Sequence, residues 1–156
     1  MLPLHEFDLG SVEVNVCVCL LRLFRQLEPE SEFQISYPND VFKNGQKMCG
    51  ILVQAERNLL VGVGFNQVNG DFSCQKLEKP VDNGAFGEQF FKMLRENRGN
   101  DLREEFFEQM LQKGRDITIG GTRYKAVGIA KPCIVLLQNQ ETGETHEHTD
   151  SLKGCW

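Results

Sequence analysis

The sequence predicts an α+β protein with a larger part of helices and strands, followed by a small antiparallel β unit. In the first part, apolar residues recur at helical spacing in three stretches, and strand-like apolar runs lie between the first and the second. After residue 113 the chain holds only short strand-like runs, separated by glycine, proline or Glu-Thr-Gly turns. This change of pattern predicts two domains, at residues 1–112 and 113–156.

The individual elements follow from the spacing of apolar residues and the positions of turn-forming residues. The first helix is expected over residues 11–27 with Ser11 as its N-cap, and Asn100 is expected to cap the third helix. An irregular loop is expected over residues 67–83. The second and third helices are expected at residues 84–97 and 101–112. The expected strands are residues 33–37, 47–54, 58–65, 116–121, 122–130, 133–140 and 144–148.

Composition narrows the class of protein. The chain has 156 residues, of which 40% are hydrophobic and 25% charged, as is usual for a globular protein. Its formal net charge is −5 and it has no long basic run, so nucleic-acid binding is not expected. No apolar stretch reaches the roughly 18 residues that span a bilayer, and the acidic N-terminus lacks the basic start of a signal peptide. Neither a membrane span nor secretion is therefore expected.

The cysteines and histidines point to a reducing compartment and to no obvious metal site. None of the cysteines forms a C-x-x-C pair, so buried or free thiols are expected in an intracellular protein. The cytoplasm is the simplest location, and an organelle is also compatible. His146 and His148 could bind a metal with Cys155, but no further ligands are suitably spaced, so exposed histidines on an edge strand are favoured. The six cysteines occupy positions 17, 19, 49, 74, 133 and 155.

Residues 35–54, with the sequence ISYPNDVFKNGQKMCGILVQ, gather polar groups between two strand-like runs. Asp40 precedes Lys47 by seven residues, and a Gly-Val-Gly-Phe-Asn strand end follows at residues 62–66. Taken singly, each feature has an ordinary explanation. Asn39 and Asp40 can start a turn, Lys47 can end a strand in solvent, and the glycines can serve packing. Taken in order, the features form a combination that is far more specific than any one of these short motifs.

This ordered set resembles the biotin–protein ligase family. That family carries W-P-N-D, then a lysine just before a G-[IV]-L-V strand, then a G-[ICA]-G-[IF]-N strand end. A helical segment and a small SH3-like β domain follow in the family. The resemblance extends from about residue 12 to residue 150. It implies the C-terminal part of the catalytic domain, a partial biotin/lipoate-ligase-type mixed sheet with helices, followed by an SH3-like antiparallel domain.

The resemblance also implies roles for individual residues. Lys47 matches the catalytic lysine that contacts the reacting carboxylate and phosphate, where an ammonium offsets the repulsion between two anions. Asn39, Asp40 and Asn66 match nucleotide-binding positions, and the oxygens of Asp40 and Asn66 suit Mg²⁺. Three glycines match positions where a ligand approaches the backbone closely, namely Gly50, Gly62 and Gly64.

The sequence departs from the family pattern in several places. Nothing in residues 1–34 resembles the G-R-G-R-x-G-R loop that closes over the adenylate, and the family's biotin pocket lies mostly in that earlier part. Tyr37 replaces the tryptophan, Ser36 replaces a residue that is often basic, and Gln54 stands where glutamate is common. We therefore expect the biotin-binding part to be missing, with exposed sheet edges and an apolar face that a second chain could cover.

Two functions fit this half-site. A biotin–protein ligase would form biotinyl-5′-AMP from biotin and MgATP, and would pass biotin to a lysine of a carboxylase carrier domain. Retention of Asp40, Lys47 and Asn66 favours this enzyme. The alternative is a catalytically inactive ligase-fold pseudoenzyme that acts as a structural or assembly subunit, which the missing biotin part favours. Lipoate ligase kinship is a third possibility, but the Pro-Asn-Asp strand and the terminal β unit fit biotin ligases better.

Overall fold

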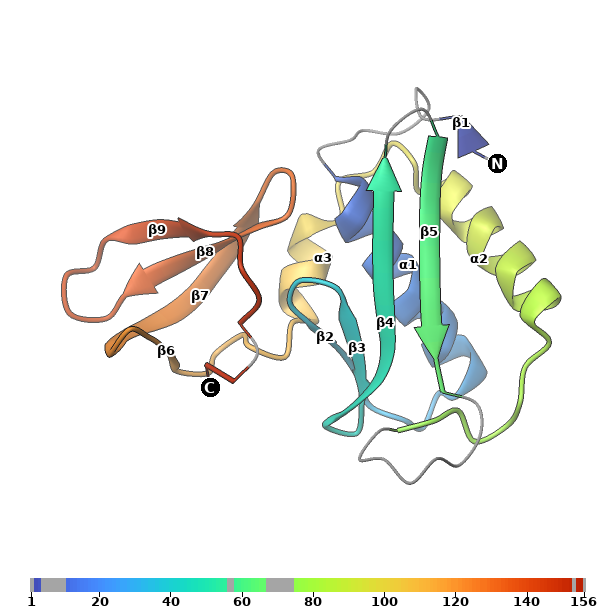
Figure 1. Cartoon of the computed structure of the whole chain (residues 1–156), viewed down its shortest axis with the longest axis horizontal. Coiled ribbons are helices and arrows are strands. Elements are labelled where there is room, and N and C mark those ends of the chain that lie inside the picture. The colour runs from blue at the N-terminus through green and yellow to red at the C-terminus, as the bar shows by residue number, and fades with distance from the viewer. Residues whose placement is uncertain (1, 4–10, 56–57, 67–74, 153, 156) are drawn as a thin grey trace.

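The computed structural model describes residues 2–3, 11–55, 58–66, 75–152 and 154–155. These residues form a five-stranded sheet with three helices and a separate four-stranded sheet, which is the expected α+β class (Figure 1). The helices are α1 (Val12–Leu27), α2 (Asn83–Glu96) and α3 (Arg103–Glu108). The strands are β1 (Leu2–Pro3), β2 (Phe33–Ser36), β3 (Asp40–Lys43), β4 (Gln46–Ala55), β5 (Asn58–Phe65), β6 (Ile117–Ile119), β7 (Thr122–Ala130), β8 (Ile134–Asn139) and β9 (Thr145–His148).

The first sheet has the strand order β1-β5-β4-β3-β2, and every pairing between its described strands is antiparallel. A parallel element is present as an isolated bridge between Ile35 and Met110. There the amide of Ile35 donates to the carbonyl of Gln109 at 2.9 Å, and the amide of Leu111 donates to the carbonyl of Ile35 at 2.7 Å. Among the described residues, the mixed character expected for this sheet is confined to that bridge.

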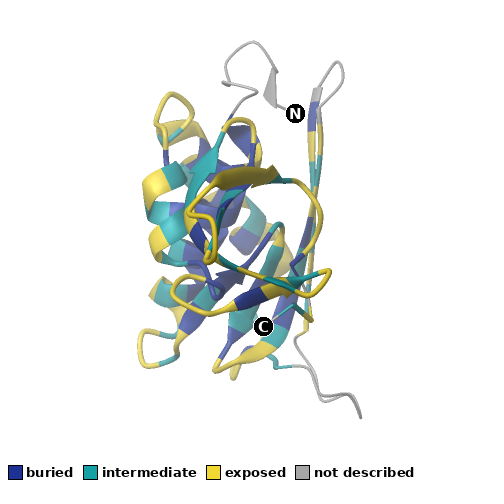
Figure 2. Ribbon diagram, turned by 90° about the vertical axis from the view of Figure 1, so that its left-hand side faces the viewer, coloured by how far each residue is buried: buried dark blue, intermediate teal, exposed yellow. Residues whose placement is uncertain are grey.

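The central helix, α1, is buried on nearly all sides. Its sequence from Val12 to Phe24 has few polar residues, and a helix that is apolar all round needs cover all round. Strands β2–β4 contact one side of it, and helices α2 and α3 contact the others. The ring of Phe24 lies 5.6–5.8 Å from the rings of Phe33, Phe65 and Phe86, measured between centroids. Figure 2 shows these helices on one side of β4 and β5, and no described helix or strand covers the other side, which is called the bare face below.

Helix α3 is shorter than expected. It ends at Glu108, whereas the sequence predicted a helix to residue 112. The backbone of residues 109–111 bonds to Ile35 instead, so the carbonyl and amide that would extend the helix are used by the sheet edge. Strand β3 was not expected either, and it forms because the chain turns back after Ser36 and pairs Asp40 with it.

Of the two expected helix caps, Ser11 is confirmed as the N-cap residue of α1, whereas Asn100 needs correction. Leu102 is the N-cap of α3, whereas Asn100 belongs to the preceding turn, where its Nδ2 donates to Asn97 Oδ1 at 3.1 Å. Ser11 does precede α1, but its side chain makes no capping hydrogen bond. Asp82 caps α2, and its Oδ1 accepts a bond from the amide of Ala85 at 2.8 Å.

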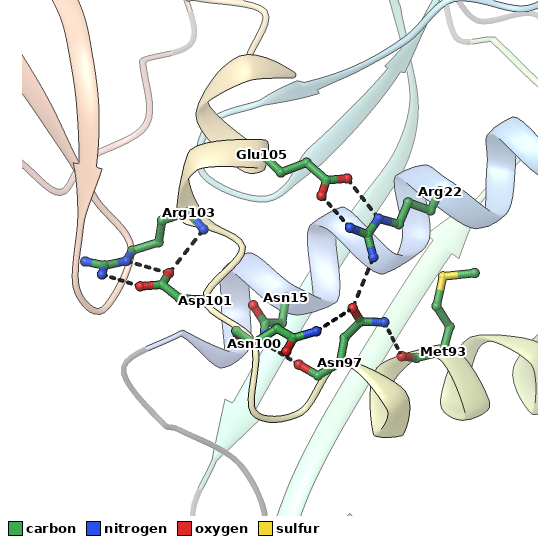
Figure 3. A network of polar contacts seen from close by, with 8 residues as sticks. All are labelled: Asn15, Arg22, Met93, Asn97, Asn100, Asp101, Arg103 and Glu105. Carbon is green, nitrogen blue, oxygen red and sulfur yellow. Dashed lines mark hydrogen bonds and ion pairs between the residues drawn. The ribbon is translucent and has the colours of Figure 1, made fainter.

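A polar network joins the three helices where α2 turns into α3 (Figure 3). Asn15 of α1 is buried, and its Nδ2 donates to the carbonyls of Asn97 and Asn100 at 3.2 and 2.9 Å. Further along α1, Arg22 forms a two-bond ion pair with Glu105 of α3, and also donates to Asn97 Oδ1 at 3.1 Å. Bidentate charge-assisted bonds of this kind fix α3 against α1.

The C-terminal sheet has the order β6-β7-β8-β9 and lies beside α3 (Figure 1). Its four strands fall within the ranges expected from the sequence. The chain end returns to this sheet, because the amide of Thr118 donates to the carbonyl of Cys155 at 2.7 Å. The division into domains at residue 113 stays a prediction.

The described cysteines are free thiols, as expected. Cys17, Cys19, Cys49 and Cys133 are buried and Cys155 is partly buried. Cys74, and residues 67–74 of the expected loop, lie outside the described residues. Within the described part of the chain, no helix has both the length and the apolar character needed to cross a bilayer.

Candidate functional site

The turn between β2 and β3 carries the Tyr-Pro-Asn-Asp sequence and is fastened to β4. The Nδ2 of Asn39 donates to the carbonyl of Ile51 at 2.6 Å, and the amide of Ile51 donates back to the carbonyl of Asn39 at 2.9 Å. Asn39 therefore extends the β3–β4 pairing by one residue with its side chain. This places Asp40, the next residue, at a fixed position beside β4.

Asp40 and Lys47 form an ion pair on the bare face of the sheet. Lys47 Nζ lies 2.6 Å from Asp40 Oδ2. Gly50 is directly opposite Asp40, and a Cβ atom added there would lie 3.6 Å from Asp40 Oδ1 and 3.8 Å from Lys47 Nζ. The pair thus stands over Gly50, where the absence of a side chain leaves room for both groups.

A bulge at Met48 brings Lys47 to this face. Val41 pairs with Cys49 and Phe42 pairs with Lys47, so Met48 has no partner on β3. Lys47 and Gly50 are three residues apart, and in a regular strand their side chains would point to opposite faces. The extra residue changes the alternation and turns Lys47 towards Asp40.

The expected glycines form a strip along the bare face. Gly64 pairs with Gly50 and Gly62 pairs with Leu52 in the β4–β5 register. A Cβ atom added at Gly64 would meet no described atom within 4 Å, and one at Gly62 would meet only Leu52. Packing within the described chain therefore does not require glycine at either position. Leu52 and Leu60 flank the strip with 67% and 57% of their surface exposed, which agrees with the expected apolar face.

Asn66 follows β5 and is exposed, but its side chain holds a neighbouring segment. Its Nδ2 donates to the carbonyl of Gln75 at 3.3 Å, and its carbonyl accepts a bond from the amide of Leu77 at 3.1 Å. The amide of Gln75 in turn donates to the carbonyl of Lys47 at 2.9 Å. The structure therefore brings Asp40, Lys47, Gly50 and Gly64 together. The side-chain amides of Asn39 and Asn66 instead bond to backbone carbonyls.

The chemistry available at this site is that of charge and hydrogen bonding. Cys49 lies next to Gly50 in sequence, but burial, followed by the nearby Asp40 carboxylate, raises the pKa of its thiol to about 12. It therefore stays protonated and is a poor nucleophile. In the described residues, no three His, Cys, Asp or Glu side chains are placed to hold a metal ion. A single carboxylate such as Asp40 fits a Mg²⁺ that arrives with a triphosphate and keeps its waters.

Two features of the site carried no signal in the sequence. Nothing in Lys-Met-Cys-Gly distinguishes a bulged strand from a regular one, so the side that Lys47 faces could not be predicted. The contact of Gln75 with Lys47 joins residues 28 positions apart, and only the folded chain brings them together.

Comparison with known proteins yields matches among solved structures. No protein-family model and no curated protein matches the chain. A biotin protein ligase from Aquifex aeolicus matches 96% of this chain and 77% of its own, with a TM-score of 0.77 and 19% sequence identity. This chain has the biotin protein ligase fold.

The same fold relates the chain to two further structures. One is a biotin protein ligase-like protein of unknown function from Silicibacter, with a TM-score of 0.65 and 17% identity over 92% of this chain and 74% of that one. The other is the biotin acetyl coenzyme A carboxylase synthetase from Helicobacter pylori with bound biotinylated ATP. It has a TM-score of 0.60 and 19% identity, covering 94% of this chain and 71% of its own.

Proposed function

We propose that this chain carries the nucleotide side of a biotin–protein ligase-type site. Such a site forms biotinyl-5′-AMP from biotin and ATP, and passes biotin to a lysine of a carboxylase carrier domain. The observation that carries the proposal is the Lys47–Asp40 ion pair standing over Gly50 at the end of a bare glycine strip. The fold is shared with the biotin protein ligase from Aquifex aeolicus and with the Helicobacter pylori synthetase that has biotinylated ATP bound, which supports the choice of reaction.

Lys47 would act on the first step of this reaction. A carboxylate oxygen of biotin attacks the α-phosphorus of ATP, and the bond to pyrophosphate breaks. Both reactants are anions, so the Lys47 ammonium lowers their repulsion and stabilises the charge that develops on the phosphate. Asp40 keeps Lys47 in place through its Oδ2, while its Oδ1 lies over Gly50, on the side where a Mg²⁺-bound triphosphate would approach.

The glycine strip would serve the close approach of the nucleotide. With no Cβ at Gly62 or Gly64, a ligand can lie directly on the backbone of β5. Asn66 would contribute at the end of this strand, where its carbonyl oxygen Oδ1 could face the metal while its Nδ2 bonds to Gln75. Asn39 would act indirectly, by fixing the turn that presents Asp40.

The biotin side would come from polypeptide that this sequence does not contain, either in the same protein or in a second chain. The outer edge of β5 pairs with β1 only at Asn58 and Leu59, among the residues that the structure describes. An apolar groove of about 400 Å³ runs along this edge, between β5 and α2. A strand that paired with this edge would fill the groove and cover apolar surface. The groove is lined by Val61, Val63, Gly64, Phe65, Asn83, Phe86, Gly87, Phe90 and Phe91.

A pseudoenzyme is the second candidate, and one observation favours it. The side-chain amides of Asn39 and Asn66 both donate to backbone carbonyls, of Ile51 and Gln75, and so have structural roles that need no ligand. A chain that kept these residues for its fold could lack activity and act as an assembly subunit.

Titration calorimetry with MgATP and with a non-hydrolysable biotinyl-adenylate analogue would separate the two candidates. We expect both to bind the wild-type chain, and Lys47→Ala to weaken MgATP binding by about tenfold or more, which corresponds to roughly 1.4 kcal/mol. Lys113→Ala is the matched control, because Lys113 is 37% exposed in an ion pair with Glu108, and Lys47 is 39% exposed in its own pair. No binding by a folded wild-type chain, or equal loss in both variants, would contradict the enzymatic proposal and leave the assembly subunit.

A further inference from the structure

Tyr37 links the proposed site to the C-terminal sheet. Its ring is buried, and its hydroxyl faces three backbone carbonyls, one just before β8 and two at or just after the end of β9. The distances are 2.9 Å to the carbonyl oxygen of Cys133, 3.1 Å to that of His148 and 3.4 Å to that of Thr149. A hydroxyl has a single proton to donate, so Cys133 is its main acceptor and the other two carbonyls stabilise the same proton electrostatically.

The hydroxyl keeps this proton under all ordinary conditions. Burial, followed by the nearby Cys133 thiol, raises the pKa of Tyr37 to about 12. The bond to the C-terminal sheet is therefore present throughout the neutral range and does not depend on pH there.

The backbone of the same turn is held from other sides. The amide of Tyr37 donates to Oε1 of the fully buried Gln112 at 3.2 Å, and Gln112 Nε2 donates to Ser36 Oγ at 3.1 Å. Gln112 lies just before the C-terminal sheet in the chain. The carbonyl of Pro38 faces the thiol of Cys17 on α1, at 3.9 Å.

These contacts leave the turn little freedom relative to the C-terminal sheet. Asp40 is three residues from Tyr37. Asn39 lies between them and makes two hydrogen bonds to Ile51, one through its side-chain amide and one through its backbone carbonyl. Asp40 is therefore held from two sides, by β4 through Asn39 and by the C-terminal sheet through Tyr37, so loss of the Tyr37 bond would loosen the turn that carries Asp40. Small displacements of positioned groups are enough to change the binding of a ligand that needs both.

We propose that Tyr37 is a positioning residue through which the C-terminal sheet sets the geometry of the Asp40–Lys47 pair. The proposal rests on the proposed function in one respect, because MgATP is the ligand expected to sense that geometry. The tie between turn and sheet can be tested without any ligand.

The test uses amide hydrogen exchange by mass spectrometry on the full chain, with Tyr37→Phe compared with Tyr124→Phe. Tyr124 is the other tyrosine of the chain and is partly buried on β7, so the second variant makes the same chemical change within the C-terminal sheet. Without ligand, we expect Tyr37→Phe to speed exchange about tenfold or more in residues 36–42 and 133–149, since local opening controls exchange. Tyr124→Phe should leave residues 36–42 unchanged. Unchanged exchange in Tyr37→Phe would overturn the proposal.

The second part of the test adds MgATP and measures whether its binding at the site changes exchange in the C-terminal sheet. In the wild-type chain, we expect MgATP to slow exchange in residues 133–149 as well as near the site, and this measurement needs no variant. In Tyr37→Phe the distant protection should disappear and the Kd for MgATP should rise about threefold, as loss of preorganisation predicts. Protection of residues 133–149 that persists in Tyr37→Phe, or that is absent in a wild-type chain that binds MgATP, would refute the coupling. A wild-type chain that does not bind MgATP would instead refute the proposed function, and the ligand-free comparison would still decide whether the tie exists.

Discussion

The two faces of the five-stranded sheet differ in what covers them. One face carries buried side chains such as Val41, Ile51 and Leu59, which pack beneath the helices. The other carries glycines, the exposed Leu52 and the Asp40–Lys47 pair. Folding free energy comes from burial on the first face. The residues of the second face can therefore be changed with little effect on stability. Their charged side chains and exposed backbone are available for binding.

The largest expected effect is loss of stability from the covered face. Phe24→Ala removes a ring that packs against three other phenylalanines, and should lower the free energy of unfolding by about 3–5 kcal/mol. Leu52→Ala, on the bare face, should change it by less than about 0.5 kcal/mol. Urea unfolding of the two variants measures the difference. Similar losses in both would show that the bare face is covered in solution.

A second comparison uses two lysines of the same β3–β4 hairpin. Lys43 has 3% of its side chain exposed, and its Nζ lies 2.6 Å from Glu28 Oε2. Lys43→Ala leaves the mostly buried Glu28 carboxylate without its counter-charge, although the Glu78 amide still bonds to it, and should cost about 3 kcal/mol. Lys47→Ala breaks a half-exposed pair and should cost no more than about 1 kcal/mol. Thermal unfolding at neutral pH checks the order, and an equal cost would contradict the burial argument.

The buried pair also predicts a pH dependence. Burial alone would raise the pKa of Glu28, but bonds from Lys43 and the Glu78 amide outweigh it and lower that pKa below its usual 4.5. A carboxyl with a lowered folded-state pKa stabilises the fold above the unfolded-state pKa, and this stability is lost as the pH falls. The stability difference between wild type and Glu28→Gln should therefore be largest at neutral pH and shrink below about pH 4.5. Glu30→Gln, an exposed change two residues away, should give a small difference, and a constant gap for Glu28→Gln would contradict the linkage.

A small effect on stability is expected at the glycine strip. Gly64→Ala adds a methyl group that meets no described atom, so stability should change by less than about 1 kcal/mol. MgATP binding should nevertheless weaken, because the methyl group occupies the space proposed for the nucleotide. Gly99→Ala, in the turn after α2, also meets no described atom and should leave binding unchanged. Calorimetric titration measures the affinity of both variants for MgATP. Unchanged binding in Gly64→Ala would show that the glycine strip is not part of the proposed site.

Local patterns were sufficient to predict much of this fold. The strands β4 and β5, the helices α1 and α2 and the four C-terminal strands lie where apolar spacing and turn residues predicted them. The end of one helix was predicted wrongly where the backbone bonds to a distant segment. Helix α3 stops because residues 109–111 bond to Ile35, more than 70 positions away, and no local pattern encodes that contact.

The same division applies to the candidate site. The sequence by itself determined which polar groups are available, since Asp40, Lys47 and the glycines could be named from the resemblance of their ordered motifs to the biotin–protein ligase family. Only the tertiary structure decided how they are used. The Met48 bulge turns Lys47 towards Asp40, backbone carbonyls take the amides of Asn39 and Asn66, and the Tyr37 hydroxyl reaches the C-terminal sheet. Each outcome depends on hydrogen bonds between segments that meet only after folding, because a polar group cut off from water bonds to whichever partner the packed chain places beside it.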